Sequence, residues 1–312
     1  MAKKRKKGHL ILGILLVVVA FISIRSLLNF EIFGNLANKK TEGVTGNFSR
    51  EYARFYSDVN FNMFSGHALL INLTTGDILF EHASDVRVYP ASLTKIMTVL
   101  LGIEQAYGAT MTVRADFAQL IYDNASIVGF EYGEQRLASE IFHGAMLPSG
   151  ADATATIAYH VGGSYHGFVG LMNEKAQSLG MYDTHFMNAS GLHHPNHYTT
   201  AYDIAILLSH ALENSTFRTI FTTRVYSFIN RSGEEQYMHS TLFSNLWATE
   251  FEGGEIVGGR TGFTYAAGRC LATLATNGYD EFILITLGAN SIDEDGRTHI
   301  ADAFTIYQYF LK

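Results

Sequence analysis

The chain has 312 residues, of which 47% are hydrophobic and 16% are charged, a composition typical of a globular protein with a sizeable core. The single cysteine, Cys270, rules out an intrachain disulfide, and the apolar stretch around it predicts a small buried side chain. Residues 3–7 hold five of the 22 Lys and Arg residues; the other 17 face 29 Asp and Glu, so the rest of the chain carries a net charge near −12. Such an acidic body argues against nucleic-acid binding and against lying flat on an anionic membrane.

The N-terminal segment has the pattern of a membrane anchor. Residues 8–24, "GHLILGILLVVVAFISI", contain no Asp, Glu, Lys or Arg. The segment reaches 23 residues when it is extended to residue 30 past Arg25, whose long side chain can snorkel to the membrane surface. That length spans a bilayer of about 30 Å, and the positive flank at residues 3–7 should stay in the cytoplasm. We therefore expect residues 1–30 to be a basic tail and a transmembrane helix, which makes this a single-pass cell-membrane protein with its body outside the cytoplasm. A cleaved signal peptide and a secreted body are the alternative, although no convincing small-x-small cleavage site follows the run.

The rest of the chain divides into a short linker and one globular domain. Residues 31–50 are polar, rich in Gly and Asn and without period, which predicts a linker. Residues 51–312 are patterned throughout. They begin with two apolar runs around "TTGD" in 67–84, which predict a hairpin, and continue with a mostly helical block over 92–212.

The C-terminal third is predicted to be rich in β-strands. Within the helical block, apolar residues at helical spacing indicate helices over 138–147 and 167–180. After it, strands are expected near residues 222–230, 258–264, 268–276 and 280–289, and a closing helix over 297–311. The short turns between the late strands favour an antiparallel sheet, so the fold class is α+β.

The stretch "YPASLTKIMTVLLG", residues 89–102, contains the first candidate for chemistry. Ser92 and Lys95 stand one helical turn apart at the start of an apolar helix. A serine hydroxyl is a poor nucleophile until a base takes its proton, and an amine whose pKa is lowered by burial can be that base. By itself, however, Ser-x-x-Lys occurs by chance in most chains of this length.

Two further stretches make the chance explanation less credible. In "AMLPSGADATATIA", Ser149 follows a proline at a helix break. In "GGRTGFT", Arg260 and Thr261 offer donors for a carboxylate, and Gly262 would let a substrate lie against a strand edge.

In this order the three elements resemble the low-molecular-mass penicillin-binding proteins, the serine D-alanyl-D-alanine carboxypeptidases. The resemblance runs from about residue 50 to residue 312 and includes "HGAMLPSGADA", "LMNEKAQSLGM" and "NASGLHHPNHYTTAYDIA". It implies the penicillin-binding-protein and β-lactamase-like transpeptidase fold, an antiparallel sheet flanked by helices with a mainly helical subdomain. It further implies a peptidoglycan stem peptide ending in D-Ala-D-Ala as substrate, β-lactams as covalent inhibitors, and neither a metal nor a cofactor.

The resemblance also implies a role for each matched residue. Ser92 corresponds to the acylated nucleophile, Lys95 to its general base and Ser149 to a serine that relays protons. Arg260 stands where the family usually has a lysine that holds the substrate's terminal carboxylate. The backbone N–H groups of Ser92 and Phe263 correspond to the oxyanion hole.

One departure from the family pattern leaves alternatives open. Ala151 stands where the second motif usually has an asparagine that bonds the substrate amide. A β-lactamase is one alternative, although no Glu-x-x-Leu-Asn stretch is found. A wall-binding pseudoenzyme is another, although the Ser92–Lys95 pair is intact.

Histidines invite a metal-site interpretation that the spacing does not favour. His185, His193, His194 and His197 do not follow the His-Glu-x-x-His pattern, so we expect a polar loop beside the cleft. His143 lies on an apolar helix face and is predicted to be a hydrogen-bonded core residue.

Overall fold

The computed structural model describes residues 48–49, 62–290 and 296–312, and its centre is one antiparallel sheet. The strand order is β2-β1-β10-β9-β8-β7, and each neighbouring pair is antiparallel. The strands are β1 (His67–Asn72), β2 (Asp77–His82), β7 (Glu250–Phe251), β8 (Gly254–Thr264), β9 (Gly268–Thr276) and β10 (Glu281–Ala289). The predicted α+β class, the antiparallel sheet and the hairpin in 67–84 are thus confirmed.

The central strands are apolar on both faces because both faces are covered. Successive side chains of β10 alternate between two cores: Ile283 and Ile285 pack with the helical block, whereas Leu284 packs on the other face. That second face is covered by α10 (Thr298–Phe310), the predicted closing helix. Its Tyr307 is fully buried, and its hydroxyl lies 2.9 Å from Thr273 Oγ1 on β9.

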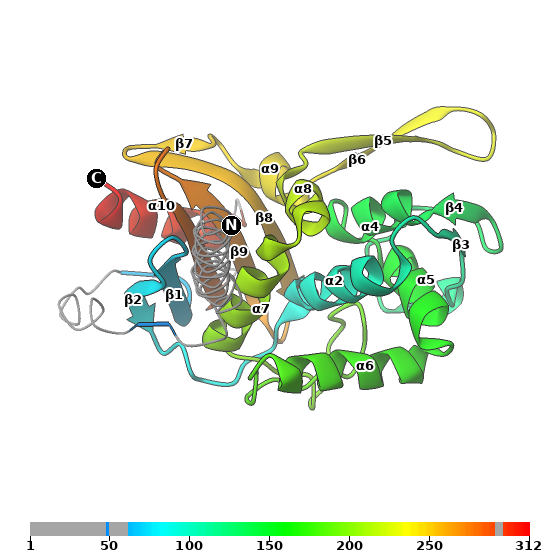
Figure 1. The fold of residues 1–312 in the computed structure, drawn as a ribbon, viewed down its shortest axis with the longest axis horizontal. Helices are drawn as coiled ribbons and strands as arrows, with labels where there is room; N and C mark the ends of the chain where they lie inside the picture. Colours follow the sequence, from blue (N-terminus) through cyan, green and yellow to red (C-terminus); the bar gives the residue numbers. More distant parts are fainter. Residues whose placement is uncertain (1–47, 50–61, 291–295) are drawn as a thin grey trace, which may run out of the picture. The chain divides into compact units, whose positions relative to one another are not determined.

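A block of helices covers the first face of the sheet and extends beyond it (Figure 1). Helix α2 runs through the middle of this block and contacts α4, α5 and α7, while α7 also packs on the sheet. Apart from the one-turn η2 (Ala91–Leu93), the helices are α2 (Thr94–Ala106), α3 (Phe117–Tyr122), α4 (Ala138–Met146), α5 (Ala151–Gly162), α6 (Tyr165–Ser178), α7 (Ala201–Glu213), α8 (Ser215–Thr222) and α9 (Thr241–Asn245). The two helices predicted at 138–147 and 167–180 correspond to α4 and α6.

Of the four short strands inside and beside the helical block, only β5 was predicted. β3 (Thr110–Thr112) pairs with β4 (Gln135–Leu137), and β5 (Val225–Ile229) pairs with β6 (Glu235–His239). Three residues are too few to show a period of two, and β6 is mostly polar because most of its side chains are exposed. β5, expected as a strand of the late sheet, instead belongs to this separate hairpin, which extends over α4 (Figure 1).

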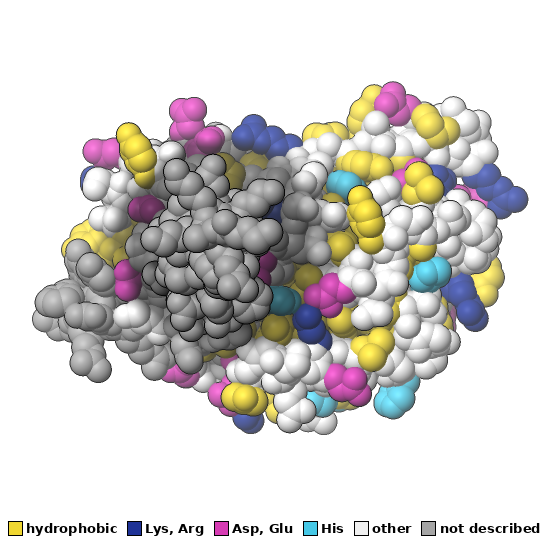
Figure 2. Space-filling view, in the orientation of Figure 1, with side chains coloured by type: hydrophobic (Ala, Val, Ile, Leu, Met, Phe, Trp, Pro, Cys, Tyr) yellow, Lys and Arg dark blue, Asp and Glu magenta, His cyan; other side chains and the backbone are white. Residues whose placement is uncertain are grey.

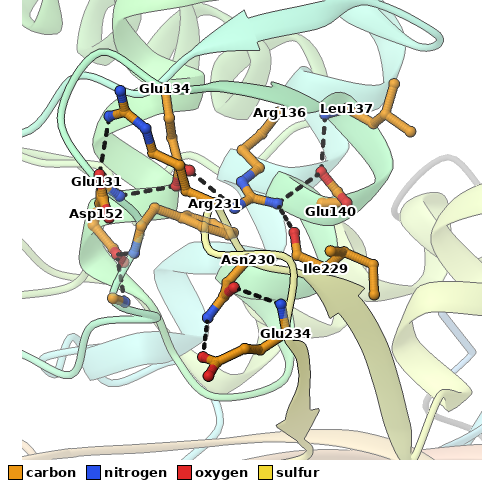
Figure 3. Close-up of polar contacts among 12 residues, drawn as sticks. Glu131, Glu134, Arg136, Leu137, Glu140, Asp152, Ile229, Asn230, Arg231 and Glu234 are labelled. Atoms are coloured by element: carbon orange, nitrogen blue, oxygen red, sulfur yellow. Dashed lines mark hydrogen bonds and ion pairs between the residues drawn. The ribbon is translucent and has the colours of Figure 1, made fainter.

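Arg136 fastens the β5–β6 hairpin to the helical block (Figure 3). Its buried guanidinium donates to the Ile229 carbonyl at 2.5 Å and pairs with Glu134 at 2.9 Å. An exposed ion pair between Arg231 and Glu131, with 3.0 Å between Nη1 and Oε2, adds a second link. The hairpin therefore forms a fixed wall beside the loop that leads to α5.

Two residues of the expected linker are described and join the sheet. Ser49 N–H donates to the Gly76 carbonyl at 2.9 Å, and the Ser49 carbonyl accepts from Ile78 N–H at 2.8 Å, next to β2. The side chain of Phe48 is buried against the core. These contacts bring the chain onto the sheet edge before residue 51.

The predicted membrane helix lies outside the described residues. Within the described ranges, no helix combines the length and the apolar character needed to cross a bilayer. On the face that Figure 2 shows, Lys and Arg side chains are scattered singly among acidic and apolar ones.

Candidate active site

The three predicted catalytic side chains meet at the junction of the sheet and the helical block. Ser92 lies in η2, and its Oγ is 3.1 Å from Lys95 Nζ on the first turn of α2. The same Oγ is 3.1 Å from the Oγ of Ser149, which lies in the turn between α4 and α5. Ser149 has a positive φ of 73°, a conformation that is rare for a serine and directs this hydroxyl at Ser92.

Lys95 is a buried amine without a carboxylate among its described hydrogen-bond partners. Its side chain is 2% exposed, and Nζ donates to Ser92 Oγ and to the carbonyl of Ser190. Burial holds the pKa of Lys95 well below its usual value, the charge of Arg260 lowers this pKa further, and Asp152 opposes the shift. Near pH 7 the neutral fraction of this amine is therefore larger than that of an exposed lysine, and the neutral amine can accept the Ser92 proton.

Residues 188–192, which the sequence did not single out as catalytic, form a turn that places a backbone carbonyl against Lys95. Asn188 Oδ1 accepts the N–H groups of Ser190 and Gly191 at 3.1 and 2.7 Å, which shapes a tight turn. Gly191 has φ 85°, and a Cβ there would lie 1.9 Å from the Ala91 carbonyl oxygen. The "NASG" pattern indicates such a turn, but nothing local reveals that its carbonyl would face Lys95.

His197 supports η2 and is unavailable to a metal. Its Nδ1 accepts from Met187 N–H at 3.3 Å, so Nε2 carries the proton and donates to Thr94 Oγ1 at 2.8 Å. Thr94 Oγ1 in turn donates to the Ala91 carbonyl at 2.8 Å. Burial lowers the pKa of His197 to about 3, which keeps the ring neutral.

The other histidines are engaged in separate contacts. His185 Nδ1 lies 2.8 Å from the Asn196 carbonyl, and the His193 ring packs edge-on against Tyr89. The described part of the chain contains no group of three or more His, Cys, Asp or Glu arranged to hold a metal ion. His143 is buried, stacks on Tyr226 and bonds the Ser139 carbonyl at 2.7 Å through Nδ1, as expected of a core histidine.

Arg260 reaches the site from β8 but lies behind it. The residue is fully buried and donates to Ser149 Oγ at 2.5 Å, to the Met146 carbonyl at 2.7 Å and to the Ser92 carbonyl at 3.3 Å. Burial lowers the pKa of Arg260 to about 9, so the guanidinium stays charged at neutral pH. The guanidinium therefore lies behind Ser149 and is not exposed to the cleft. The sequence had predicted that it would contact the substrate carboxylate directly.

The remaining residues of this motif line the edge of β8. Thr261 is half-buried, and its hydroxyl donates to Thr241 Oγ1 at 2.8 Å. A Cβ on Gly262 would lie 2.9 Å from the Ser92 backbone nitrogen, so only glycine allows β8 to come this close to η2. Phe263 is 42% exposed and lies beneath the Arg269 guanidinium.

Asp152 is a second functional candidate that the sequence did not reveal. Its buried carboxylate accepts the backbone N–H groups of Val128, Gly129 and Phe130 at 2.9 to 3.3 Å (Figure 3). These bonds hold the 128–130 loop against the start of α5, directly after Ser149. Cys270 is buried as predicted, and burial raises the pKa of its thiol to about 12, so the thiol stays protonated at neutral pH.

A sheet edge facing a helical block, with Ser-x-x-Lys at the junction, is the arrangement of the penicillin-binding-protein-like fold. The crystal structure of the Streptomyces K15 DD-transpeptidase is similar, with a TM-score of 0.70 and 28% identity over 80% of this chain and 99% of that one. A D-alanyl-D-alanine carboxypeptidase structure from Mycobacterium tuberculosis H37Rv gives a TM-score of 0.66 and 25% identity, covering 78% and 91% of the two chains.

The family assignment follows from the sequence matches. The model of the D-alanyl-D-alanine carboxypeptidase family matches residues 56–291, and the chain belongs to this family. A D-alanyl-D-alanine carboxypeptidase of Bacillus subtilis strain 168 is 33% identical over 73% of the chain, and one of Streptomyces sp. strain K15 is 30% identical over 73%. The match spans 58% of the length of the Bacillus relative and 81% of the Streptomyces one.

Substituting Gly191 tests whether the 188–192 turn packs tightly against the backbone of η2. Gly191→Ala should lower the free energy of unfolding by about 2–4 kcal/mol, because alanine is strained at this φ and its Cβ meets the Ala91 carbonyl. Thermal unfolding followed by circular dichroism measures the loss. Gly170→Ala is the matched control, since a Cβ there meets nothing within 4 Å on an exposed turn of α6 and should leave the protein equally or more stable. Equal melting temperatures for the two variants would contradict this description of the turn.

Proposed function

We propose that this protein is a serine-type D-Ala-D-Ala carboxypeptidase that removes the terminal D-alanine from peptidoglycan stem peptides. The observation that carries the proposal is the buried Lys95 amine, 3.1 Å from Ser92 Oγ, with Ser149 Oγ equally close on the other side. Membership of the D-alanyl-D-alanine carboxypeptidase family supports the choice of substrate. The chemistry needs only side chains and backbone groups of this chain.

In the proposed mechanism Lys95 acts as a base and Ser92 as a nucleophile. The neutral amine takes the Ser92 proton as Oγ attacks the carbonyl carbon of the penultimate D-alanine. The C–N bond then breaks, Ser149 passes the proton from Lys95 to the departing amine, and D-alanine leaves. Water then attacks the ester carbonyl carbon while Lys95, neutral again, takes a water proton. The bond from this carbon to Ser92 Oγ breaks, Lys95 returns the proton to Oγ, and the shortened peptide leaves as a carboxylic acid.

Charge and backbone geometry support the binding half of this proposal. The substrate carboxylate would meet the hydroxyls of Ser149 and Thr261, with the positive charge of Arg260 directly behind Ser149. The N–H groups of Ser92 and Phe263 would hold the oxyanion, which is consistent with the close approach of β8 to η2 at Gly262.

The two alternatives are less well supported. The family relationship points to peptide substrates rather than to a β-lactamase. A pseudoenzyme would have no need to keep Lys95 Nζ and Ser149 Oγ each within hydrogen-bond distance of Ser92 Oγ. Ala151 removes one amide partner, worth roughly 0.5–1.5 kcal/mol, which is expected to slow turnover rather than abolish it.

We further propose that residues 1–30 anchor the enzyme in the cell membrane with the catalytic domain outside the cytoplasm. Support comes from residues 8–24, which contain no Asp, Glu, Lys or Arg, and from the positive charges before them. An anchor there would keep the domain beside the cell wall, where stem peptides are found.

Penicillin labelling tests the nucleophile. A fluorescent penicillin should attach covalently to Ser92, because its acyl-enzyme is the counterpart of the peptide intermediate, and peptide mass mapping should locate the adduct. Ser92→Ala should abolish labelling and D-alanine release from a pentapeptide ending in D-Ala-D-Ala. Ser139→Ala, a change of an exposed serine on α4, should retain both. Binding of the pentapeptide without any D-alanine release above the Ser92→Ala background would favour the pseudoenzyme.

The pH dependence of acylation tests the lysine. Below the folded-state pKa of Lys95 the amine is protonated and cannot act as a base, so the acylation rate should fall as the pH is lowered through that pKa. Because burial lowers this pKa, the midpoint of the acid limb should lie well below 10.5, the ordinary lysine value. The second-order rate of penicillin acylation measured from pH 5 to 11 gives the midpoint, and Lys95→Arg should lose about 10²–10⁴-fold at every pH. A midpoint close to 10.5 would exclude a desolvated lysine base.

Membrane fractionation tests the anchor. The full chain should remain in the membrane pellet after a high-salt wash, because salt screens charges but does not reverse the burial of a long apolar helix. N-terminal sequencing should begin at or next to Met1. A mature N-terminus near residue 40 would instead show a cleaved signal peptide.

A further inference from the structure

The backbone of Ser149 has an unfavourable conformation that its surroundings must enforce. Its φ of 73° lies in the left-handed region, which a residue with a Cβ rarely adopts and which persists only where other contacts hold it. Gly150, the next residue, is the N-cap of α5 and has no side chain that could cap this helix. Contacts from elsewhere in the chain must therefore hold both the turn and the first residues of α5.

The loop of residues 126–130 supplies such contacts. The Ser126 carbonyl accepts the Ala151 N–H at 2.8 Å, which satisfies one of the free donors at the start of α5. The Val128 side chain packs over Gly150, where an added Cβ would lie only 2.4 Å from Val128 Cγ2. The loop thus lies directly against the turn between α4 and α5.

Asp152 holds this loop in place (Figure 3). Its carboxylate accepts the N–H groups of Val128, Gly129 and Phe130 at 2.9, 3.0 and 3.3 Å. Oδ1 also accepts the N–H of Ala153 at 2.9 Å, and the residue is fully buried. A buried carboxylate is costly unless it is hydrogen-bonded, so the charge and the loop hold each other in position. An asparagine would keep only one of the two accepting oxygens and would turn an amide NH₂ toward some of these donors.

Asp152 can influence the reaction only through the turn beside it. Among the described residues, its hydrogen bonds go to backbone N–H groups and not to the three catalytic side chains. Ser149 Oγ, in contrast, accepts from Arg260 at 2.5 Å and lies 3.1 Å from Ser92 Oγ. Because the guanidinium can only donate, the Ser149 hydroxyl proton points away from it and is available for transfer. Where that proton points depends on the backbone that Asp152 supports.

We propose that Asp152 is a positioning residue: by holding residues 128–130 against the start of α5, it fixes the Ser149 hydroxyl where it can pass a proton to the departing amine. This inference rests on the proposed carboxypeptidase function. In the step concerned, the C–N bond breaks and nitrogen keeps the electron pair. Ser149 gives its hydroxyl proton to that nitrogen and takes one from Lys95.

Two substrates that differ only in the leaving group test the inference. Nα,Nε-diacetyl-L-lysyl-D-alanyl-D-alanine has an amide bond to break, whereas its analogue ending in D-thiolactate has a thioester, from which the thiolate leaves without a proton. For both, kcat/KM reports acylation of Ser92. Asp152→Asn should lower the amide-to-thioester ratio of kcat/KM about ten- to hundredfold, because it removes part of the roughly 10²–10⁴-fold that a positioned proton donor contributes. A smaller folded fraction lowers both rates equally and leaves this ratio unchanged.

Asp302→Asn is the matched control. Asp302 is also a buried carboxylate that accepts consecutive backbone N–H groups, from Phe64 at 3.0 Å and Ser65 at 2.7 Å. It lies on α10, which covers the other face of the sheet. This variant should be less stable to heat but should keep the wild-type ratio.

A second pair of variants decides the matter if Asp152→Asn does not fold. Gly129→Ala strains the loop at a donor to Asp152, since the φ of Gly129 is 94°. Gly133→Ala introduces the same kind of strain at φ 80°, but Gly133 donates to the Val113 carbonyl instead. An added Cβ meets nothing within 4 Å at either position. Only Gly129→Ala should lower the ratio, by about threefold or more, because a small displacement of a reacting group is costly.

Combining the change with Ser149→Ala tests whether Asp152 acts through that serine. Ser149→Ala alone should lower the amide-to-thioester ratio at least as much as Asp152→Asn does. Adding Asp152→Asn to Ser149→Ala should then change the ratio by less than about twofold, because both residues serve the same proton transfer. Effects that multiply in the double variant would show that Asp152 acts independently of Ser149 and would overturn the inference.

The outcomes separate this inference from the function on which it rests. If wild type cleaves both substrates and Asp152→Asn keeps the wild-type ratio, the positioning role is wrong and the carboxypeptidase proposal stands. If wild type releases no D-alanine and penicillin labels nothing, the function itself fails, and the positioning role fails with it.

Discussion

The burial of the Lys95 amine against Ser92 is the constraint on which the rest of the site depends. An ammonium group in this position would be costly to desolvate, and the protein resolves that cost by favouring the neutral amine. The Ser190 carbonyl and Ser92 Oγ still satisfy its N–H groups. The structure thus turns an unfavourable burial into a base that is available near neutral pH.

Contacts from both the sheet and the helical block keep the Lys95 amine away from water while Ser92 stays accessible to substrate. Behind η2, the neutral His197 ring and Thr94 hold the backbone that carries Ser92. In front, Gly262 lets β8 lie directly against the same backbone. Arg260 ties the two halves together, since its guanidinium donates to the Ser92 and Met146 carbonyls and to Ser149. The nucleophile is therefore held by packing at a layer junction rather than by one flexible loop.

The sequence by itself determined the features that depend on near neighbours. The hairpin at 67–84, the helices at α4, α6 and α10, the strands β8 to β10 and the Ser92–Lys95 pair all follow from periods of two or about 3.6 residues and from turn residues. Motif order added Ser149 and the residues of β8. Only the tertiary structure showed that the Ser190 carbonyl faces Lys95, that Arg260 is fully buried and that Asp152 holds residues 128–130 against the start of α5. These features join residues up to 168 positions apart, as Arg260 and Ser92 are, and whether a side chain is buried depends on what the rest of the chain packs against it.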